Sequence, residues 1–202
     1  MFLFNYANLV DPLLRGLRTL TVDFAGMRPG ERALDVCCGT GAQVFECARH
    51  GIDAHGVDID PDMLRMGVGD RHREVSGQVS FQLADATRLP FVDGAFDYVT
   101  ISLALHDKTR LDRSRVVAEM GRVVKPGGTL VFTDYQVPLP LNPLTALARG
   151  VEYFAGGTHY AGFRDYLRSG TLGSLIEGRG LHPVESRVLL NGLVIMVKAR
   201  RG

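Results

Sequence analysis

Glycines, small polar residues and an acidic side chain gather where the sequence predicts that a first buried strand ends. Asp35 lies inside the apolar run 32–37, and the residues at its end are Cys37, Cys38, Gly39, Thr40 and Gly41. Glycines let a ligand approach the backbone closely, and a following helix presents free N–H groups to a carboxylate or phosphate. This spacing predicts a loop that binds a nucleotide-type cofactor.

Further polar residues follow the next predicted strands. Asp58 ends the second strand, about 20 residues after the glycines, where an acid can accept hydrogen bonds from ribose hydroxyls. After the third strand, the Asp85 carboxylate and the Ala86 N–H could recognise an adenine edge. The fourth strand leads to His106. Because ligands bind at the carboxyl ends of strands in an open parallel sheet, we expect these groups to lie together.

The elements that must position these residues alternate along the chain. Helical spacing of apolar residues predicts a helix over 8–26. Strands are predicted over 32–37, 54–57, 79–83, 96–102 and 129–133, and helices over 42–50, 61–68 and 110–124. Asp60 is expected to cap the helix at 61–68, with Pro61 in its first turn. Repeated strand–helix units predict an α/β fold with a mostly parallel, doubly wound sheet.

The pattern changes after residue 134. Residues 135–180 are predicted to be helical, and two apolar strands over 184–190 and 193–198 are joined by Asn191 and Gly192, a strong hairpin signal. We therefore predict one domain over 1–202 with a seven-stranded sheet that includes one antiparallel strand. Its parts are a helical cap (1–28), a cofactor-binding core (29–134), a helical insert (135–180) and a hairpin (181–202).

Composition limits the partners of the chain. With 202 residues and a net charge of +1, it offers no general electrostatic basis for binding nucleic acid or an anionic membrane. The apolar start is short and lacks a basic region and a cleavage site, so we expect no signal peptide, and no apolar stretch reaches about 18 residues. Cys37, Cys38 and Cys47 fit neither a disulfide framework nor a zinc site. We expect a cytoplasmic protein with a small-molecule partner and no metal; the sequence does not indicate the oligomeric state.

The glycine loop and Asp58 alone would also fit a nicotinamide dinucleotide. The dinucleotide fingerprint needs a third glycine three residues after Gly41, and Val44 occupies that position. The predicted antiparallel ending also departs from the dinucleotide pattern. An NAD(P)-dependent oxidoreductase is therefore the less favoured alternative, and a non-catalytic cofactor-binding protein is a second one.

Four motifs resemble those of class I S-adenosylmethionine-dependent methyltransferases, specifically the branch (methyltransferase type 11) similar to ubiquinone and menaquinone C-methyltransferases. They are 34–41 (LDVCCGTG), 56–64 (GVDIDPDML), 84–91 (ADATRLPF) with 96–97 (FD), and 119–128 (EMGRVVKPGG). The resemblance covers about residues 30–134. It implies a Rossmann-like fold, S-adenosylmethionine as methyl donor and S-adenosylhomocysteine as product. After the fourth strand that branch tends to carry Gly-Phe-Gly-Leu-Arg-Asn, whereas this chain has Ser102-Leu103-Ala104-Leu105-His106-Asp107.

The resemblance also assigns cofactor contacts by position. Asp35 would lie near the methionine amino group, and Ile59 or Met63 would pack on the adenine. Ser102 and Leu103 would contact the cofactor on the side facing the acceptor. The full set implied is Asp35, Cys37, Gly39, Thr40, Gly41, Asp58, Ile59, Met63, Asp85, Ala86, Ser102 and Leu103.

Methyl transfer from a sulfonium mainly requires alignment and exclusion of water, and a base only when the acceptor must lose a proton. His106 is the candidate base because imidazole titrates near neutrality; alternatively, it starts the next helix and bonds locally. His159 and Tyr160 in the insert are candidates for acceptor contact, with packing of the insert as their alternative. The aromatic insert and the apolar residues after the fourth strand predict a small, fairly apolar acceptor, methylated on oxygen, nitrogen or carbon.

Overall fold

The computed structural model describes residues 15–68, 75, 77–170, 172–177 and 179–202. Within this part, seven strands form one sheet in the order β3-β2-β1-β4-β5-β7-β6. They are β1 (Arg32–Val36), β2 (Asp53–Asp58), β3 (Val79–Leu83), β4 (Phe96–Ser102), β5 (Val124–Tyr135), β6 (Leu181–Leu189) and β7 (Val194–Arg201). β7 runs antiparallel to β5 and β6, and the other strand pairs are parallel. The predicted doubly wound, seven-stranded sheet is confirmed.

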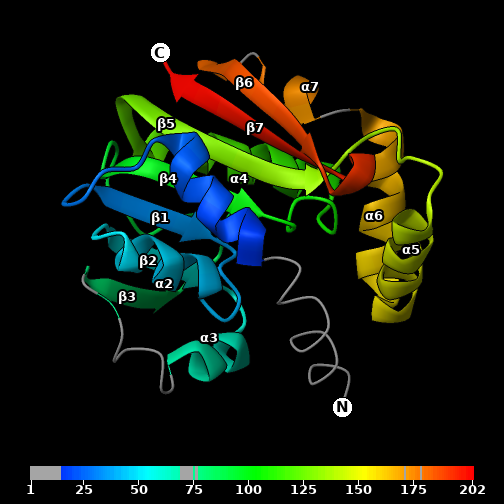
Figure 1. Ribbon diagram of the computed structural model, residues 1–202, viewed down its shortest axis with the longest axis horizontal. Helices are drawn as coiled ribbons and strands as arrows, with labels where there is room; N and C mark the ends of the chain where they lie inside the picture. The colour runs from blue at the N-terminus through cyan, green and yellow to red at the C-terminus, as the bar shows by residue number, and fades with distance from the viewer. Residues whose placement is uncertain (1–14, 69–74, 76, 171, 178) are drawn as a thin grey trace.

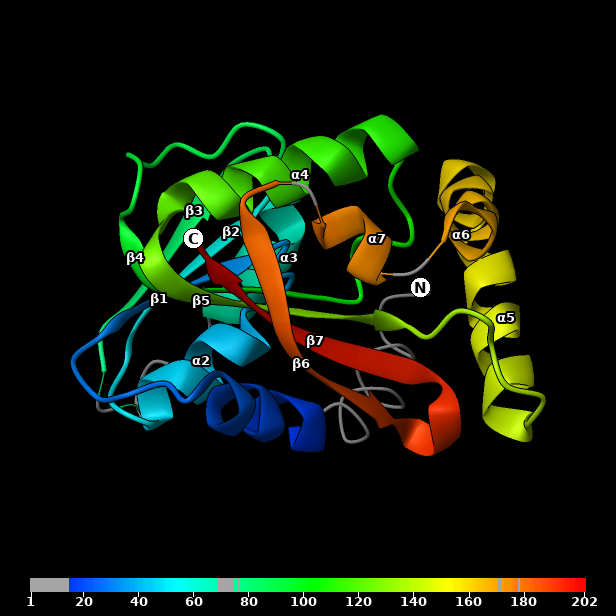
Figure 2. The same ribbon diagram turned by 90° about the horizontal axis from the view of Figure 1, so that it is seen from above.

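Helices cover both faces of the sheet (Figures 1 and 2). The helix at 15–25 and α2 (Ala42–Arg49) lie on one face, and α4 (Arg110–Val123) and α7 (Leu172–Ile176) lie on the other. α3 (Pro61–Val68) follows β2. α5 (Pro143–Ala155) and α6 (Gly157–Ser169) stand beyond the end of the sheet to which β5 points. Residues 8–14 of the predicted first helix lie outside the described residues.

The core is divided between the two faces of the sheet. Because successive strand residues point to opposite faces, Leu34 of β1 joins the cluster under α4, whereas its neighbour Ala33 joins the cluster under α2. Val116 and Met120 of α4 are fully buried against the face of the sheet that α4 covers. Central strands are therefore apolar on both faces, which holds their carboxyl ends in fixed positions.

The structure refines several predicted boundaries. β5 begins at Val124 rather than 129, because the chain pairs with β4 again after a register shift at Phe96 and Tyr98. The hairpin turn between β6 and β7 is a 3-10 turn, Leu190–Gly192, in which Leu190 and Asn191 both have positive φ. The predicted cap of α3 is confirmed, since Asp60 Oδ1 accepts from the N–H of Asp62 at 2.8 Å.

No helix among the described residues is both long and apolar enough to cross a bilayer.

Candidate active site

A cavity of about 320 Å³ lies at the carboxyl ends of β1, β2 and β3. Here the strand order reverses, with β2 and β3 on one side of β1 and β4 on the other. Five of the predicted cofactor residues line the cavity: Cys37, Asp58, Ile59, Asp85 and Ala86. The volume falls in the range of small-molecule sites, about 300–1,000 Å³. The structure therefore places a ligand-sized space where ligands bind in open α/β sheets.

The loop between β1 and α2 is shaped by residues with positive φ: Cys37 (57°), Gly39 (53°) and Gly41 (72°). A Cβ atom at Gly39 would meet no heavy atom within 4 Å, so this backbone faces open space. A Cβ atom at Gly41 would lie 2.3 Å from the Phe81 ring. Gly39 thus leaves room for a ligand, whereas Gly41 allows close packing where α2 begins.

Asp58 connects the two loops that follow β1 and β2. Its Oδ2 accepts from the Gly39 N–H at 2.7 Å, and its Oδ1 accepts from the Asp60 N–H at 3.0 Å. Each carboxylate oxygen can accept a second hydrogen bond. Asp58 can therefore bind ribose hydroxyls while it holds the glycine loop in place.

Asp35 is a buried residue of β1, and its Oδ1 accepts from the hydroxyl of Thr100 on the neighbouring strand β4 at 2.7 Å. Burial raises the pKa of Asp35 to about 7, in spite of the opposing hydrogen bond from Thr100. A cationic amino group nearby would favour the charged carboxylate. Its position fits the predicted role beside the methionine amino group, although Asp35 is not among the residues that line the 320 Å³ cavity.

The residues predicted to hold the adenine have contrasting surroundings. Asp85 Oδ1 accepts from the Thr87 N–H and hydroxyl, both at 2.8 Å, and these bonds lower the pKa of Asp85. Ile59 also lines the cavity, and its side chain is 69% exposed. An exposed large apolar side chain beside an ionised acceptor suits a ligand with a flat ring and an amino group.

The other predicted cofactor residues lie on the loops and elements around these strand ends. A Cβ atom at Gly67 of α3 would lie 2.3 Å from the Thr40 carbonyl oxygen, so α3 packs closely on the loop. Leu103, directly after Ser102, has a φ of 50° and donates its N–H to the Thr133 carbonyl at 2.8 Å. The described cavity wall includes neither Leu103 nor the following residues: Gly39, Thr40, Gly41, Met63 and Ser102.

Sequence reasoning missed the α4 side of the cavity. Asp112, Arg115 and Val116 line it with Lys108 and Thr87. The spacing of Asp112, Arg115 and Val116 could have indicated this wall, because residues three and four positions apart lie on one face of a helix. Lys108 is paired with Asp107 at 3.2 Å.

A second group of polar side chains lies where β4 and β5 end near α5 and α6. His106 is 3% exposed, and its Nδ1 contacts Asp134 Oδ1 at 2.7 Å while its Nε2 lies 3.5 Å from Glu152 Oε1. His159 Nε2 contacts Glu152 Oε2 at 2.6 Å. The hydroxyl of Tyr135 donates to Glu152 Oε1 at 2.8 Å. The structure thus brings His106 and His159 together around a glutamate that the sequence did not single out.

The charge state of His106 bears on its predicted role. Burial disfavours the charged ring, but Asp134 and Glu152 outweigh this and raise the pKa of His106 to about 10. Burial likewise opposes the charge on Glu152, but hydrogen bonds from His106 and His159 lower its pKa to about 2. A protonated ring cannot accept a proton, so this arrangement favours His106 as a donor. Its role as a base stays a prediction.

The hydrogen bonds of His106 are not only local, as the alternative to a role as a base would require. It lies in a turn before α4, and its backbone N–H donates to Asp134 Oδ2 at 3.1 Å, across from β4 to β5. Tyr160 packs edge-to-face with the Tyr153 ring, with centroids 5.4 Å apart, and Arg164 lies over the Tyr160 ring. Among the described residues, no hydrogen bond or ion pair joins Tyr160 to His106 or His159.

Arg113 of α4 holds α6 beside this cluster. The side chain is buried, and its Nε donates to the Leu105 carbonyl at 3.0 Å. Its Nη2 donates to the Gly162 carbonyl at 2.9 Å, and its Nη1 donates to Ser169 Oγ at 2.9 Å. One guanidinium group therefore joins the loop after β4 to the helix that carries His159.

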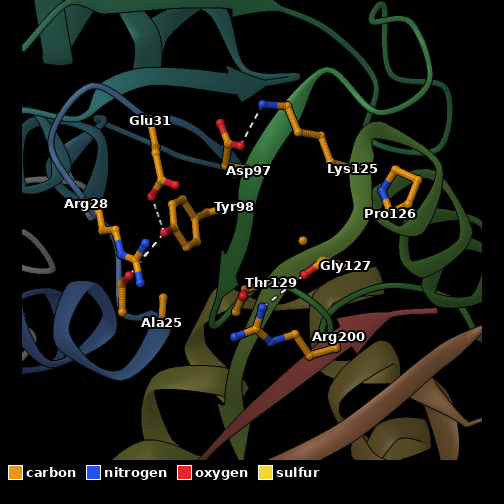
Figure 3. Close-up of a pocket in the computed structure, with 12 residues that line it drawn as sticks. Ala25, Arg28, Glu31, Asp97, Tyr98, Lys125, Pro126, Gly127, Thr129 and Arg200 are labelled. Carbon is orange, nitrogen blue, oxygen red and sulfur yellow. Dashed lines mark hydrogen bonds and ion pairs between the residues drawn. The ribbon is translucent and has the colours of Figure 1, made fainter.

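Another cavity, of about 250 Å³, lies at the opposite end of the parallel strands (Figure 3). Four of its charged side chains, Asp97, Lys125, Glu31 and Arg200, are engaged with other side chains or with the backbone. Lys125 Nζ contacts Asp97 Oδ1 at 2.6 Å, Tyr98 donates to Glu31, and Arg200 donates to the Gly127 carbonyl at 2.9 Å. This end of a parallel sheet is not where ligands bind, so we assign these contacts to the stability of the fold.

Comparisons with known proteins agree with the geometry. The model of the ubiE/COQ5 methyltransferase family matches residues 14–145, which include the glycine loop, Asp58 and Asp85. A demethylmenaquinone methyltransferase of Beutenbergia cavernae is 34% identical over 198 residues, covering 91% of this chain and 79% of that protein. The ubiquinone/menaquinone biosynthesis C-methyltransferase UbiE of Yersinia pestis is 39% identical over 132 residues, covering 63% of this chain and 51% of that protein.

The chain thus spans about half the length of the Yersinia relative. Among solved structures, a SAM-dependent methyltransferase of Methanosarcina mazei has a TM-score of 0.66 at 20% identity, covering 90% of this chain and 96% of that one. This likeness supports the fold. The family match extends over well more than half of the chain and includes every residue that lines the 320 Å³ cavity. The chain belongs to the ubiE/COQ5 methyltransferase family, and it is an S-adenosylmethionine-dependent methyltransferase.

Proposed function

We propose that this enzyme methylates a small, largely apolar ring that carries a hydroxyl group, of the quinol class. The observation that carries the proposal is the segment 106–108, which links the two groups of residues described above. Lys108 lines the cofactor cavity and contacts Asp107, while His106 lies in the cluster with Glu152. The names of the Beutenbergia and Yersinia relatives support a quinol-type acceptor.

The cofactor side of the site positions the donor. S-adenosylmethionine supplies an activated methyl group, so the protein's main tasks are alignment and exclusion of water. We assign Asp58 to the ribose hydroxyls, Asp85 and Ala86 to the adenine edge, and Asp35 to the amino group. Gly39 leaves the backbone of the loop open, so that the cofactor can approach it closely. The remaining implied contacts, Cys37, Thr40, Gly41, Ile59, Met63, Ser102 and Leu103, complete this proposed set.

The acceptor side combines aromatic walls with charged groups. Tyr135 and Phe163 lie edge-on to the His106 ring, with centroids 4.8 and 6.0 Å away. The His159 side chain is 35% exposed, so it is the member of the cluster that an acceptor can reach. An ionised Glu152 beside it can accept a hydrogen bond from an acceptor hydroxyl. We propose that the insert 135–180 forms this side, with His159 and Tyr160 at its surface.

Methyl release tests the proposal directly. The purified protein with S-adenosylmethionine should form S-adenosylhomocysteine when a demethylated quinol with a short side chain is added, and little without an acceptor. A panel that also contains apolar amines and carboxylic acids separates acceptor classes. Turnover with amines but not quinols would contradict the acceptor class.

Binding measurements separate the alternatives. Titration calorimetry should show binding of S-adenosylmethionine and S-adenosylhomocysteine and none of NAD. Tight NAD binding without binding of the other two would overturn the cofactor assignment. Cofactor binding with no product after incubation with any cell extract would favour a non-catalytic binding protein.

We also propose that the protein works in the cytoplasm. The three cysteines carry free thiols, and Cys38 and Cys47 are buried. Free thiols persist in reducing compartments. Fractionation of cells that express the protein should recover it with cytoplasmic markers, and recovery with periplasmic or secreted markers would contradict this.

A further inference from the structure

We propose that His106, Glu152 and His159 bind a divalent transition-metal ion of the zinc class, at a site separate from the cofactor cavity. One ligand atom from each residue lies within 4.8 Å of the other two. The three residues come from the loop after β4, from α5 and from α6. The cysteines, on which the sequence-based expectation of no metal was based, take no part.

The spacing of the ligand atoms suits a small coordination sphere. Tetrahedral zinc with bonds of about 2.0–2.2 Å separates its ligand atoms by about 3.3 Å. His106 Nε2 and Glu152 Oε1 are 3.5 Å apart, close to that value. His159 Nε2 lies 2.6 Å from the other carboxylate oxygen, Glu152 Oε2. With one ligand atom from each residue, all three separations are within 4.8 Å, compared with about 3.3 Å around a tetrahedral ion.

The outer contacts of these residues are those that metal-binding histidines usually make. His106 Nδ1 contacts Asp134 Oδ1 at 2.7 Å, and His159 Nδ1 faces Asp107 Oδ2 at 3.5 Å. In each ring the nitrogen away from Glu152 therefore has a carboxylate partner. Such partners orient the ring and increase the basicity of the coordinating nitrogen.

Asp134, which orients the His106 ring, is itself held in place by several hydrogen bonds. It is fully buried, and its carboxylate accepts from the backbone N–H groups of Leu105, His106 and Tyr135 at 2.8–3.1 Å. The His106 ring is therefore fixed from one side. Its Nε2 points at the carboxylate of the proposed site.

The charges of the cluster also favour a divalent cation. Three carboxylates converge here, on Asp107, Asp134 and Glu152, and the nearby lysine is Lys108. With both rings neutral, as coordination requires, these groups sum to two negative charges; a divalent ion would balance them and would displace the proton that His106 holds in the metal-free protein. Two imidazoles with one carboxylate select zinc, iron or similar ions over magnesium or calcium, which prefer oxygen ligands.

The set leaves room for an exogenous ligand. Three protein ligands with a further open position are typical of catalytic rather than structural metal sites. The His159 side chain is 35% exposed, so solvent reaches this part of the cluster.

Metal binding to the full-length protein tests the proposal without any methyl-transfer assay. Protein that has been dialysed against a chelator should bind one Zn²⁺ per chain in titration calorimetry. Bound Co²⁺ should show the visible absorption of a four- or five-coordinate site. Because the readout is metal binding, failure of the proposed acceptor would leave this result unaffected.

Variants locate the site. Glu152→Gln and His159→Ala should each weaken Zn²⁺ binding at least tenfold, and Asp134→Asn, which alters an outer contact, should weaken it roughly 10–100-fold. His182→Ala changes an exposed histidine on β6 and should bind as the unchanged protein does. Circular dichroism identifies any variant that has lost its fold. The partly exposed His159 is the decisive position, because its replacement leaves the buried groups in place.

Several outcomes would overturn the proposal. They are the absence of saturable binding in the unchanged protein, binding by His159→Ala as tight as in the unchanged protein, and equal loss in His182→Ala. In each case the cluster is a metal-free network of ion pairs between the insert and the sheet.

Discussion

The carboxylate of Asp58 accepts hydrogen bonds that fix the glycine loop, and its oxygens can each accept one more, for example from a ribose hydroxyl. We expect Asp58→Ala to weaken S-adenosylmethionine binding by about 2 kcal/mol or more, roughly thirtyfold in Kd, because charged hydrogen bonds are lost. Titration calorimetry measures this. Asp60→Ala is the matched control, since it removes the cap of α3 and should lower stability more than affinity. An unchanged Kd in Asp58→Ala would remove Asp58 from the site.

The raised pKa of Asp35 predicts that both the stability of the fold and the affinity for the cofactor depend on pH. Its pKa is raised by burial from 3.8 to about 7, so the folded protein keeps a proton that the unfolded chain releases. Folding therefore loses stability as pH rises between these two values, and the full penalty is present above about 7. A cofactor ammonium group favours the ionised carboxylate, so cofactor affinity should increase as pH rises from 5.5 to 7.5.

Calorimetry at several pH values, with urea denaturation over the same range, tests this. Asp35→Asn should remove the step from both profiles and bind the cofactor more weakly at pH 7.5. A pH step of the same size in Asp35→Asn would assign the effect to another group.

The five predicted residues that line the 320 Å³ cavity could be placed together from the sequence because they lie at or just after strand ends, and strand ends converge in any parallel sheet. The cluster around Glu152 could not. Its contacts depend on how α5 and α6 turn toward β4 and β5, and no spacing in the sequence encodes that orientation. The sequence singled out His106, after a strand end, and His159, within the aromatic insert, but not Glu152, which joins them, or Asp134.

At the scale of elements, α6 can pack closely on the loop after β4 because Gly162 has no side chain at the contact. A Cβ atom at Gly162 would lie 2.1 Å from the Asp107 carbonyl oxygen. We expect Gly162→Ala to lower the free energy of unfolding by about 1–3 kcal/mol, because the helix must move away from a packed backbone. Urea denaturation measures the change.

A matched control lies in the neighbouring helix. Gly150 of α5 has no heavy atom within 4 Å of the corresponding Cβ position. Gly150→Ala should therefore be neutral or stabilise the protein by up to about 1 kcal/mol, through helix propensity alone. Equal effects of the two substitutions would show that α6 is not held by close packing at Gly162.

Element boundaries show what local patterns can reveal. β1 and β4 were predictable because both faces of a central strand are apolar. The start of β6 was not, since His182 and Pro183 lie exposed on the edge of the sheet and carry no apolar alternation. The early start of β5 depends on pairing with Phe96, a contact between segments far apart in the sequence.

For the molecule as a whole, one sheet supplies every loop of the cofactor cavity. The loops after β1, β2 and β3 follow strands of one continuous sheet, which has a core on each face, and α4 packs against one of these faces. A ligand that contacts them stabilises the folded state as a unit, by about 2.7 kcal/mol at a concentration of 100 Kd. We therefore expect S-adenosylhomocysteine to raise the midpoint of a single unfolding transition, and NAD to leave it unchanged. Differential scanning calorimetry with both ligands, on the unchanged protein and on Asp58→Ala, tests this. A shift of only part of the transition would mean that the cofactor site unfolds separately from the sheet that carries the hairpin.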